Sequence, residues 1–277
     1  MKTRRKRYDR PVEVAPGIHW VGFHDGDSNL HCNPYLIIEG DKAVLIDGGS
    51  RPDFPVVMRK ILQTGIAPEQ IVALVYQHPD PDLCGSMANM VDLCANEALT
   101  ILSDRANNDF LSFYLERERR GLLRSLDDLG MVFSFNGREL RFFKTPFAHT
   151  AGSLVTYDTR TRTLFTSDLF GSYSQRWDLF LRLDDRCRSC DAYDTDGPCA
   201  YGKPYCPLTD LLTFHRQVMP SEKALHRAMG VIGGVDAALI APQHGSVIDQ
   251  PEDIAFLTDC LARLTGVGCD GPGGTGG

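Results

Sequence analysis

One short segment limits what this chain can fold into, because three metal-binding side chains follow directly after a buried strand. The apolar run Ile71–Tyr76 has the length of one strand, and His78, Asp80 and Asp82 then occur at every second position. The two intervening prolines fix their own φ and push the preceding residues toward extended conformations, so that alternate side chains project to the same side. On its own, the segment is equally typical of a helix cap or a solvated turn.

Three further segments each place a polar residue at the end of an apolar strand. His149 precedes a predicted strand, Asp168 ends another and His244 follows a third. A single histidine at a strand end is more often a hydrogen-bonded surface residue than a metal ligand. All four segments in this order are hard to obtain by chance. The sequence therefore predicts a metal site formed by His78, Asp80, Asp82, His149, Asp168 and His244.

The hydrophobic pattern predicts two β-rich halves with helices. We expect strands at residues 18–22, 33–38, 43–47, 71–76, 131–135, 140–143, 154–157, 163–166 and 237–240, and helices at residues 55–64, 87–96, 109–129, 209–230 and 253–264. No internal repeat and no long linker divides the sequence. We expect a basic tail over residues 1–11, one domain over residues 12–266 and a flexible, glycine-rich tail over residues 267–277.

The composition argues against several classes of partner. The chain has 277 residues, of which 43% are hydrophobic, and this is enough for a large core. Its net charge of -7 disfavours a nucleic acid or a membrane surface bound through bulk electrostatics. No stretch approaches the roughly 18 to 20 apolar residues that span a bilayer, and no apolar segment follows the basic residues 1–7. We expect a soluble, cytoplasmic protein with no nucleic-acid and no membrane partner.

Four of the nine cysteines are concentrated in one polar segment, at about residues 184–207, that we interpret as a surface insertion. Cys187, Cys190, Cys199 and Cys206 have the spacing C-x2-C-x8-C-x6-C. This spacing is compatible with a second metal or redox site, such as a zinc or iron–sulfur knuckle. It is also compatible with a reduced or partly disulfide-linked lid over the metal pocket, or with a point of electron entry. The other five cysteines are scattered, as is typical of reduced thiols.

The four segments together resemble the metallo-β-lactamase superfamily. Leu45–Gly48 matches the early strand-and-loop motif of that superfamily, and the segments around the six candidate ligands match its successive ligand motifs in order. The resemblance covers about residues 12 to 265. It implies a metallo-β-lactamase-like αββα sandwich of the α/β (α+β) class, with two metal ions at one edge of the sheets.

Two departures from the pattern H-x-H-x-D-H, which is typical of hydrolases in this superfamily, indicate which branch of the superfamily the sequence resembles. Asp80 stands at the second position, and Leu83 has no donor atom at the last. The resulting three histidines and three aspartates suit iron, with manganese or zinc as alternatives. The sequence is similar to the flavodiiron and related oxygen-binding diiron proteins, whose motif reads H-x-E-x-D. Their pattern implies two iron ions joined by an oxo or hydroxo bridge, one held by His78, Asp80 and His149, the other by Asp82 and His244, with Asp168 between them.

The resemblance implies a non-haem diiron protein that binds dioxygen or nitric oxide. It would act as an oxygen sensor or binder, or as a reductase that takes electrons from a partner such as rubredoxin or a flavoprotein, because no flavodoxin-like FMN domain follows in this sequence. We also expect a homodimer. The alternative from a different class is a two-metal hydrolase of a phosphodiester, lactone or thioester.

Overall fold

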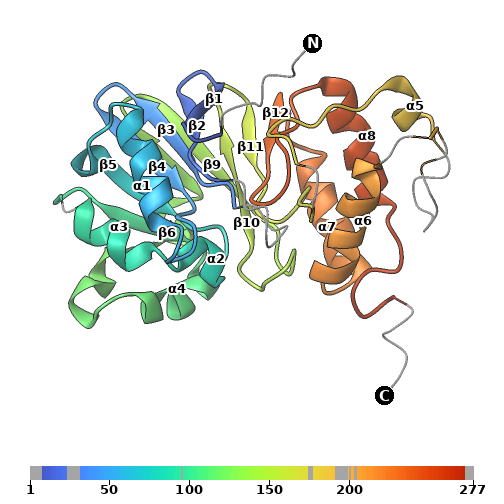
Figure 1. Ribbon diagram of the computed structural model, residues 1–277. Helices are drawn as coiled ribbons and strands as arrows, with labels where there is room; N and C mark the ends of the chain where they lie inside the picture. The colour runs from blue at the N-terminus through green and yellow to red at the C-terminus, as the bar shows by residue number, and fades with distance from the viewer. Residues whose placement is uncertain are drawn as a thin grey trace, which may run out of the picture.

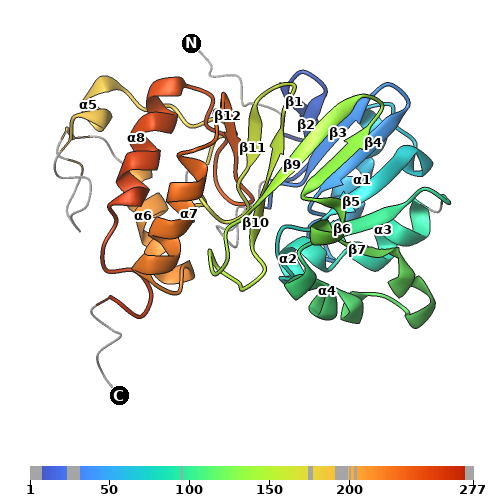
Figure 2. The same cartoon turned by 180° about the vertical axis from the view of Figure 1, so that it is seen from behind.

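Two β-sheets pack face to face, and helices cover their outer faces (Figure 1). The computed structural model describes residues 8–23, 32–94, 96–173, 177–190, 199, 201–202 and 205–271. Seen from behind, the same four layers follow one another, with one group of helices on each side of the paired sheets (Figure 2). The arrangement confirms the αββα sandwich that the sequence predicts.

The first sheet comes from the first half of the chain. Within the described residues its seven strands are ordered as in the sequence, antiparallel from β1 to β4 and parallel from β4 to β7. The strands are β1 (Val12–Ala15), β2 (Ile18–Trp20), β3 (Tyr35–Glu39), β4 (Lys42–Ile46), β5 (Ile71–Val75), β6 (Thr100–Ser103) and β7 (Leu123–Ser125).

The second sheet comes from the second half. Its five strands, counted over the described residues, have the order β12-β11-β10-β9-β8, and only β11 and β12 are parallel to each other. The strands are β8 (Val132–Phe135), β9 (Arg138–Lys144), β10 (Leu154–Asp158), β11 (Thr163–Phe165) and β12 (Leu239–Ala241). Because β11 and β12 are parallel neighbours, their carboxyl ends lie side by side at the same edge of the sheet.

Each sheet has its own helical cover, and the apolar faces of the helices explain the packing. The first group is α1 (Phe54–Gln63), α2 (Pro81–Cys84), α3 (Met87–Leu93) and α4 (Arg105–Leu111), and the second is α5 (Asp185–Arg188), α6 (Pro207–Val218), α7 (Glu222–Ile232) and α8 (Pro251–Ala262). Val57 and Ile61 of α1 are fully buried on the first sheet, and Leu225 of α7 and Leu257 of α8 are fully buried on the second. A third apolar cluster fills the space between the sheets.

Two of the predicted helices were wrong. The range 109–129 contains the end of α4, several 3-10 turns and strand β7, which pairs with β6 as a parallel edge strand. The range 209–230 contains two helices, because Pro220 follows α6 and the side chain of Ser221 then caps α7 by accepting a hydrogen bond from the Ala224 amide.

Residues just outside the expected domain limits of 12 and 266 pack against the sandwich at both ends. The Tyr8 ring lies edge-on against Trp20, and its carbonyl accepts a hydrogen bond from Lys60. Val267 is fully buried at the other end. Tyr8 and Val267 thus contact the sandwich from outside the expected limits, and the limits themselves stay a prediction. Among the described residues, no helix has the length and apolar character needed to cross a membrane.

The arginine of a buried ion pair in the second sheet also bonds to the first half of the chain. Arg138 on β9 donates hydrogen bonds from Nε and Nη2 to the two carboxylate oxygens of Asp158 on β10, at 2.8 and 2.9 Å. The same guanidinium donates to the carbonyl oxygens of Pro16 and Ile38 in the first sheet. Both charged side chains are almost completely buried. The bidentate geometry and the extra carbonyl partners offset the cost of removing these charges from water.

We expect Arg138→Leu to lower the free energy of unfolding by about 3–5 kcal/mol, because it leaves the buried Asp158 charge without its partner. Urea unfolding measures the change. The matched control is Arg105→Ala, which removes an exposed ion pair with Asp128 and should cost about 1 kcal/mol or less. Equal losses in the two variants would show that Arg138 does not join the sheets.

Candidate metal centre

The six predicted side chains meet at one rim of the sandwich because the strands that precede or follow them end there. His78 follows β5, Asp168 follows β11 and His244 follows β12, while His149 lies in the loop between β9 and β10. Helix α2, which begins at Pro81, lies at the same rim between the two halves (Figure 1). Four loops that are distant in the sequence therefore meet at this rim, because the strands next to them end there.

His78, Asp80 and His149 form the first part of the site. The Nε2 atom of His149 donates a hydrogen bond to Asp80 Oδ2 at 2.8 Å, and His78 Nε2 lies 3.7 Å from the same oxygen. The two imidazole rings are 5.4 Å apart between centroids, in an edge-on arrangement. Donor atoms of His78, His149 and Asp168 lie within 4.8 Å of one another, which is close enough for one metal ion.

Asp82 and His244 form the second part. His244 Nε2 lies 3.1 Å from Asp82 Oδ2 and 3.6 Å from Asp168 Oδ1. His78 Nε2 approaches Asp168 Oδ1 from the other side, at 3.8 Å. Asp168 therefore lies between the two parts. The structure brings all six predicted residues together.

The Oδ1 atom of Asp168 is the strongest sign that a cation belongs here. Asp168 is only 3% exposed, and this oxygen has no hydrogen-bond partner. A buried polar atom without a partner costs roughly 1–3 kcal/mol, and more for a charged group. A metal ion on either side would satisfy the oxygen, so the residues present fit a two-metal centre.

Neighbouring groups fix the orientation of the imidazoles. The Nδ1 atom of His78 is hydrogen-bonded to Ser167 Oγ at 2.7 Å, and His149 Nδ1 donates to the Val218 carbonyl at 3.1 Å. Both arrangements leave Nε2 facing the other candidate ligands. His149 and Ser167 have φ values of 88° and 54°, in the left-handed region that side chains other than glycine rarely adopt. Such strain at a cluster of ligands is typical of a functional site.

Protons balance the carboxylates when no cation is bound. The hydrogen bond to Asp80 raises the pKa of His149 to about 9. Burial lowers the pKa of His244, but its hydrogen bonds with Asp82 and Cys32 outweigh this and raise it well above the usual value. Burial also raises the pKa of Asp47, beside the site, to about 7. Metal binding must therefore displace protons.

Cys32 also belongs to this region, although no sequence motif indicates it. Its sulfur lies within 4.8 Å of donor atoms of Asp82 and His244, and the side chain is only 5% exposed. In the sequence, Cys32 is one of several scattered thiols. Its only local signal is its position just before β3, and nothing in that position indicates a ligand.

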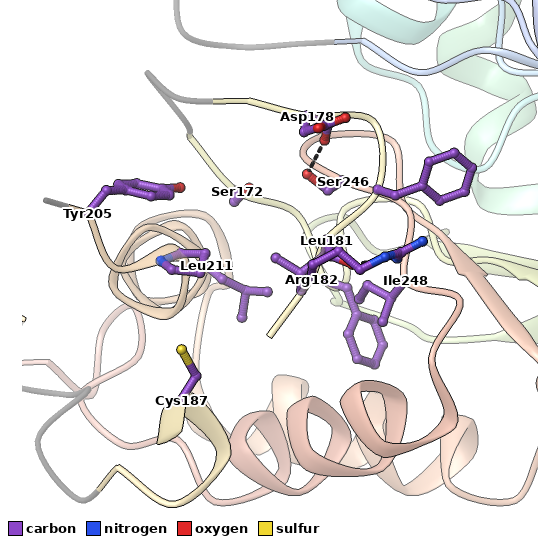
Figure 3. A pocket seen from close by; sticks show the side chains of 12 residues that line it. Ser172, Asp178, Leu181, Arg182, Cys187, Tyr205, Leu211, Ser246 and Ile248 are labelled. Atoms are coloured by element: carbon purple, nitrogen blue, oxygen red, sulfur yellow. Dashed lines mark hydrogen bonds between the residues drawn. The ribbon is translucent and has the colours of Figure 1, made fainter. Parts of the chain in front are cut away.

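The four cysteines of the insertion do not join the six residues. All four lie in the described part of the chain, where none forms a disulfide and no three of them come together as donors for a metal. Cys187 instead lines a cavity of about 320 Å³, together with Leu211 and Ser246 (Figure 3). Phe170 and Ser246, which also line this cavity, belong to the loops of Asp168 and His244, but none of the six candidate ligands of the metal centre lines it. A metal or redox role for the insertion stays a prediction.

Comparison with known proteins assigns the chain to a family. A family model described as the ODP family beta lactamase matches residues 30–245. The chain belongs to this family. Type A flavoprotein from Rhodobacter capsulatus is 27% identical over 260 residues, which cover 90% of this chain and 54% of that protein. The chain thus spans about half the length of the curated relatives that it matches.

Solved structures share the fold of this ODP-family chain. Rubredoxin oxygen:oxidoreductase from Desulfovibrio gigas superposes with a TM-score of 0.73 at 19% identity, covering 91% of this chain and 61% of that one. The apo form of the chemotaxis sensor ODP from T. denticola gives 0.71 at 21% identity, covering 94% and 95%. The second match covers nearly the whole of both chains.

We expect a divalent metal to stabilise the folded protein. With free ferrous ion at a hundred times its Kd under anaerobic conditions, the free energy of unfolding should rise by about 2.7 kcal/mol, because the ligands converge only in the folded state. Urea unfolding with and without metal measures the increase. His244→Ala should lose most of it, whereas His226→Ala, on α7, should retain it. A metal effect that is the same in both variants would argue against this site.

Proposed function

We propose that this chain is a non-haem diiron protein that binds dioxygen at the rim of the sandwich. The observation that carries the proposal is the unpartnered, buried Oδ1 of Asp168, which lies between His78 and His244. Membership of the ODP family supports it. The names of similar proteins, a rubredoxin oxygen:oxidoreductase and a chemotaxis sensor, agree with oxygen chemistry or sensing.

The side chains divide into two ligand sets. In this proposal His78, Asp80 and His149 would hold one iron, Asp82 and His244 would hold the other, and Asp168 would serve both. Asp80 is one methylene shorter than the glutamate of the related motif, and its hydrogen bond with His149 supports its role as a ligand in this proposal.

The donor set favours iron over zinc. Three carboxylates and three imidazoles form an oxygen-rich set, and Leu83, where hydrolases have a histidine, is fully buried in the core of the first half. Two adjacent ferrous ions can each supply one electron to a diatomic ligand. The residues of this chain would hold the ions, orient the imidazoles and keep bulk water away from Asp168. Among the described residues of the site, none favours the hydrolase alternative over this proposal.

Electrons for repeated turnover would come from another protein. We propose a rubredoxin-like or flavoprotein donor, with nitric oxide as a second diatomic ligand. Without a donor, the same site would bind dioxygen once for each reduction and act as a sensor. The cytoplasmic location, the homodimer and the domain limits at residues 12 and 266 stay predictions from the sequence.

The decisive test is anaerobic loading with ferrous iron followed by exposure to dioxygen. We expect two irons per chain, dioxygen uptake in proportion to the iron bound, and a new visible absorption band. Asp168→Asn should weaken iron binding at least about tenfold, because changes even to groups that support metal ligands typically cost ~10–100-fold. Asp128→Asn, which changes an exposed carboxylate, should behave as the unmodified protein.

Two results would contradict the proposal. One is a protein that excludes iron but binds zinc and hydrolyses an ester, lactone or phosphodiester. The other is an iron-loaded protein that consumes no dioxygen and shows no spectral change on exposure to it.

A further inference from the structure

Cys32 lies beside the half of the metal centre that has fewer candidate ligands. Asp82 and His244 supply only two side chains to their half of the site, besides the shared Asp168, whereas the other half has three. Leu83 adds no donor, because its side chain is buried in the core. The Cys32 sulfur lies within 4.8 Å of donor atoms of both Asp82 and His244, and forms a hydrogen bond with the His244 side chain.

Hydrogen bonds from distant parts of the sequence hold Cys32 in this place. The neighbouring Asn33 donates from Nδ2 to the carbonyl oxygens of Pro242 and Gly245, at 3.0 and 2.9 Å, on either side of His244. Its backbone amide donates to the Gln243 carbonyl at 2.9 Å. Trp20 Nε1 donates to Asn33 Oδ1 at 2.8 Å and fixes the amide orientation. The hydrogen bonds of Asn33 thus hold the neighbouring Cys32 next to the loop that carries His244.

A second observation, the environment of Asp168, supports a cation at this position. The unpartnered Oδ1 of Asp168 is buried and lies 3.6 Å from His244 Nε2. A cation between Asp82, His244 and Asp168 would therefore satisfy this oxygen and meet the sulfur as well. Thiolate is a strong metal ligand, and a thiol loses its proton to the solvent when it binds a metal.

We propose that Cys32 is a further metal ligand, which completes the position formed by Asp82 and His244 and makes the two halves of the centre chemically different. One half has only nitrogen and oxygen donors, and the other adds a soft sulfur donor. The second position would then tolerate zinc or cobalt better than the first. This inference rests on the two-metal centre proposed above.

Cobalt(II) binding to the full-length chain tests the inference without relying on activity. A thiolate ligand gives an intense sulfur-to-cobalt charge-transfer band in the near ultraviolet, which oxygen and nitrogen donors do not. Cys187→Ser and Cys190→Ser are introduced into all variants first, because thiols of the insertion could give the same band. Equilibrium dialysis under anaerobic conditions counts the cobalt bound.

We expect two cobalt ions per chain and a charge-transfer band in this background. Adding Cys32→Ser, which keeps a hydrogen-bonding group beside His244, should abolish the band and weaken the second cobalt by about tenfold or more. Adding Cys94→Ala, which removes a buried thiol from the core of the first half, should leave both unchanged.

The outcomes separate this inference from the proposed function. Two bound cobalt ions with no band, or with a band that survives Cys32→Ser, would overturn the role of Cys32 and leave the two-metal centre standing. No cobalt binding at all would overturn both. Circular dichroism of each variant checks that it is folded.

Discussion

The site depends on one electrostatic constraint, which is the gathering of several carboxylates in a largely buried space. Asp168 and Asp47 are almost fully buried, and Asp80 and Asp82 lie beside them. Like charges this close raise the free energy of the folded state unless protons or cations compensate them. In the absence of metal, the histidines hold the protons and carry compensating positive charge, which explains the raised pKa values of His149 and His244. A pair of divalent cations would replace those protons and would also reach Asp168 Oδ1, which is buried and accepts no hydrogen bond.

The stability of the rest of the sandwich offsets the free-energy cost of gathering these charges at the rim. The three apolar clusters and the buried Arg138–Asp158 pair stabilise the two sheets away from the rim, so the rim can carry strained residues and uncompensated polar atoms. Ser167 and His149 adopt left-handed backbone conformations there, and His215 fixes the following loop by accepting a hydrogen bond from the Phe170 amide. Burial lowers the pKa of His215 to about 4, which keeps its Nε2 as an acceptor near neutral pH.

Much of the site could be predicted because its signals are local. The prolines in the loop of His78, and the apolar strands that end at Asp168 and His244, are visible in a few residues of sequence. Cys32 could not be predicted, because its place depends on side-chain bonds between Asn33 and a loop more than 200 residues away. The errors in secondary structure have a similar origin. Residues 123–125 form a strand only because β6 offers an unpaired edge, and no pattern within that segment indicates it.

The most direct test of the account is anomalous diffraction at the iron absorption edge, on crystals of the protein loaded anaerobically with ferrous iron. The account predicts two peaks about 3.5–4 Å apart, one on each side of the Asp168 carboxylate. A single peak, or iron bound away from Asp168, would contradict it.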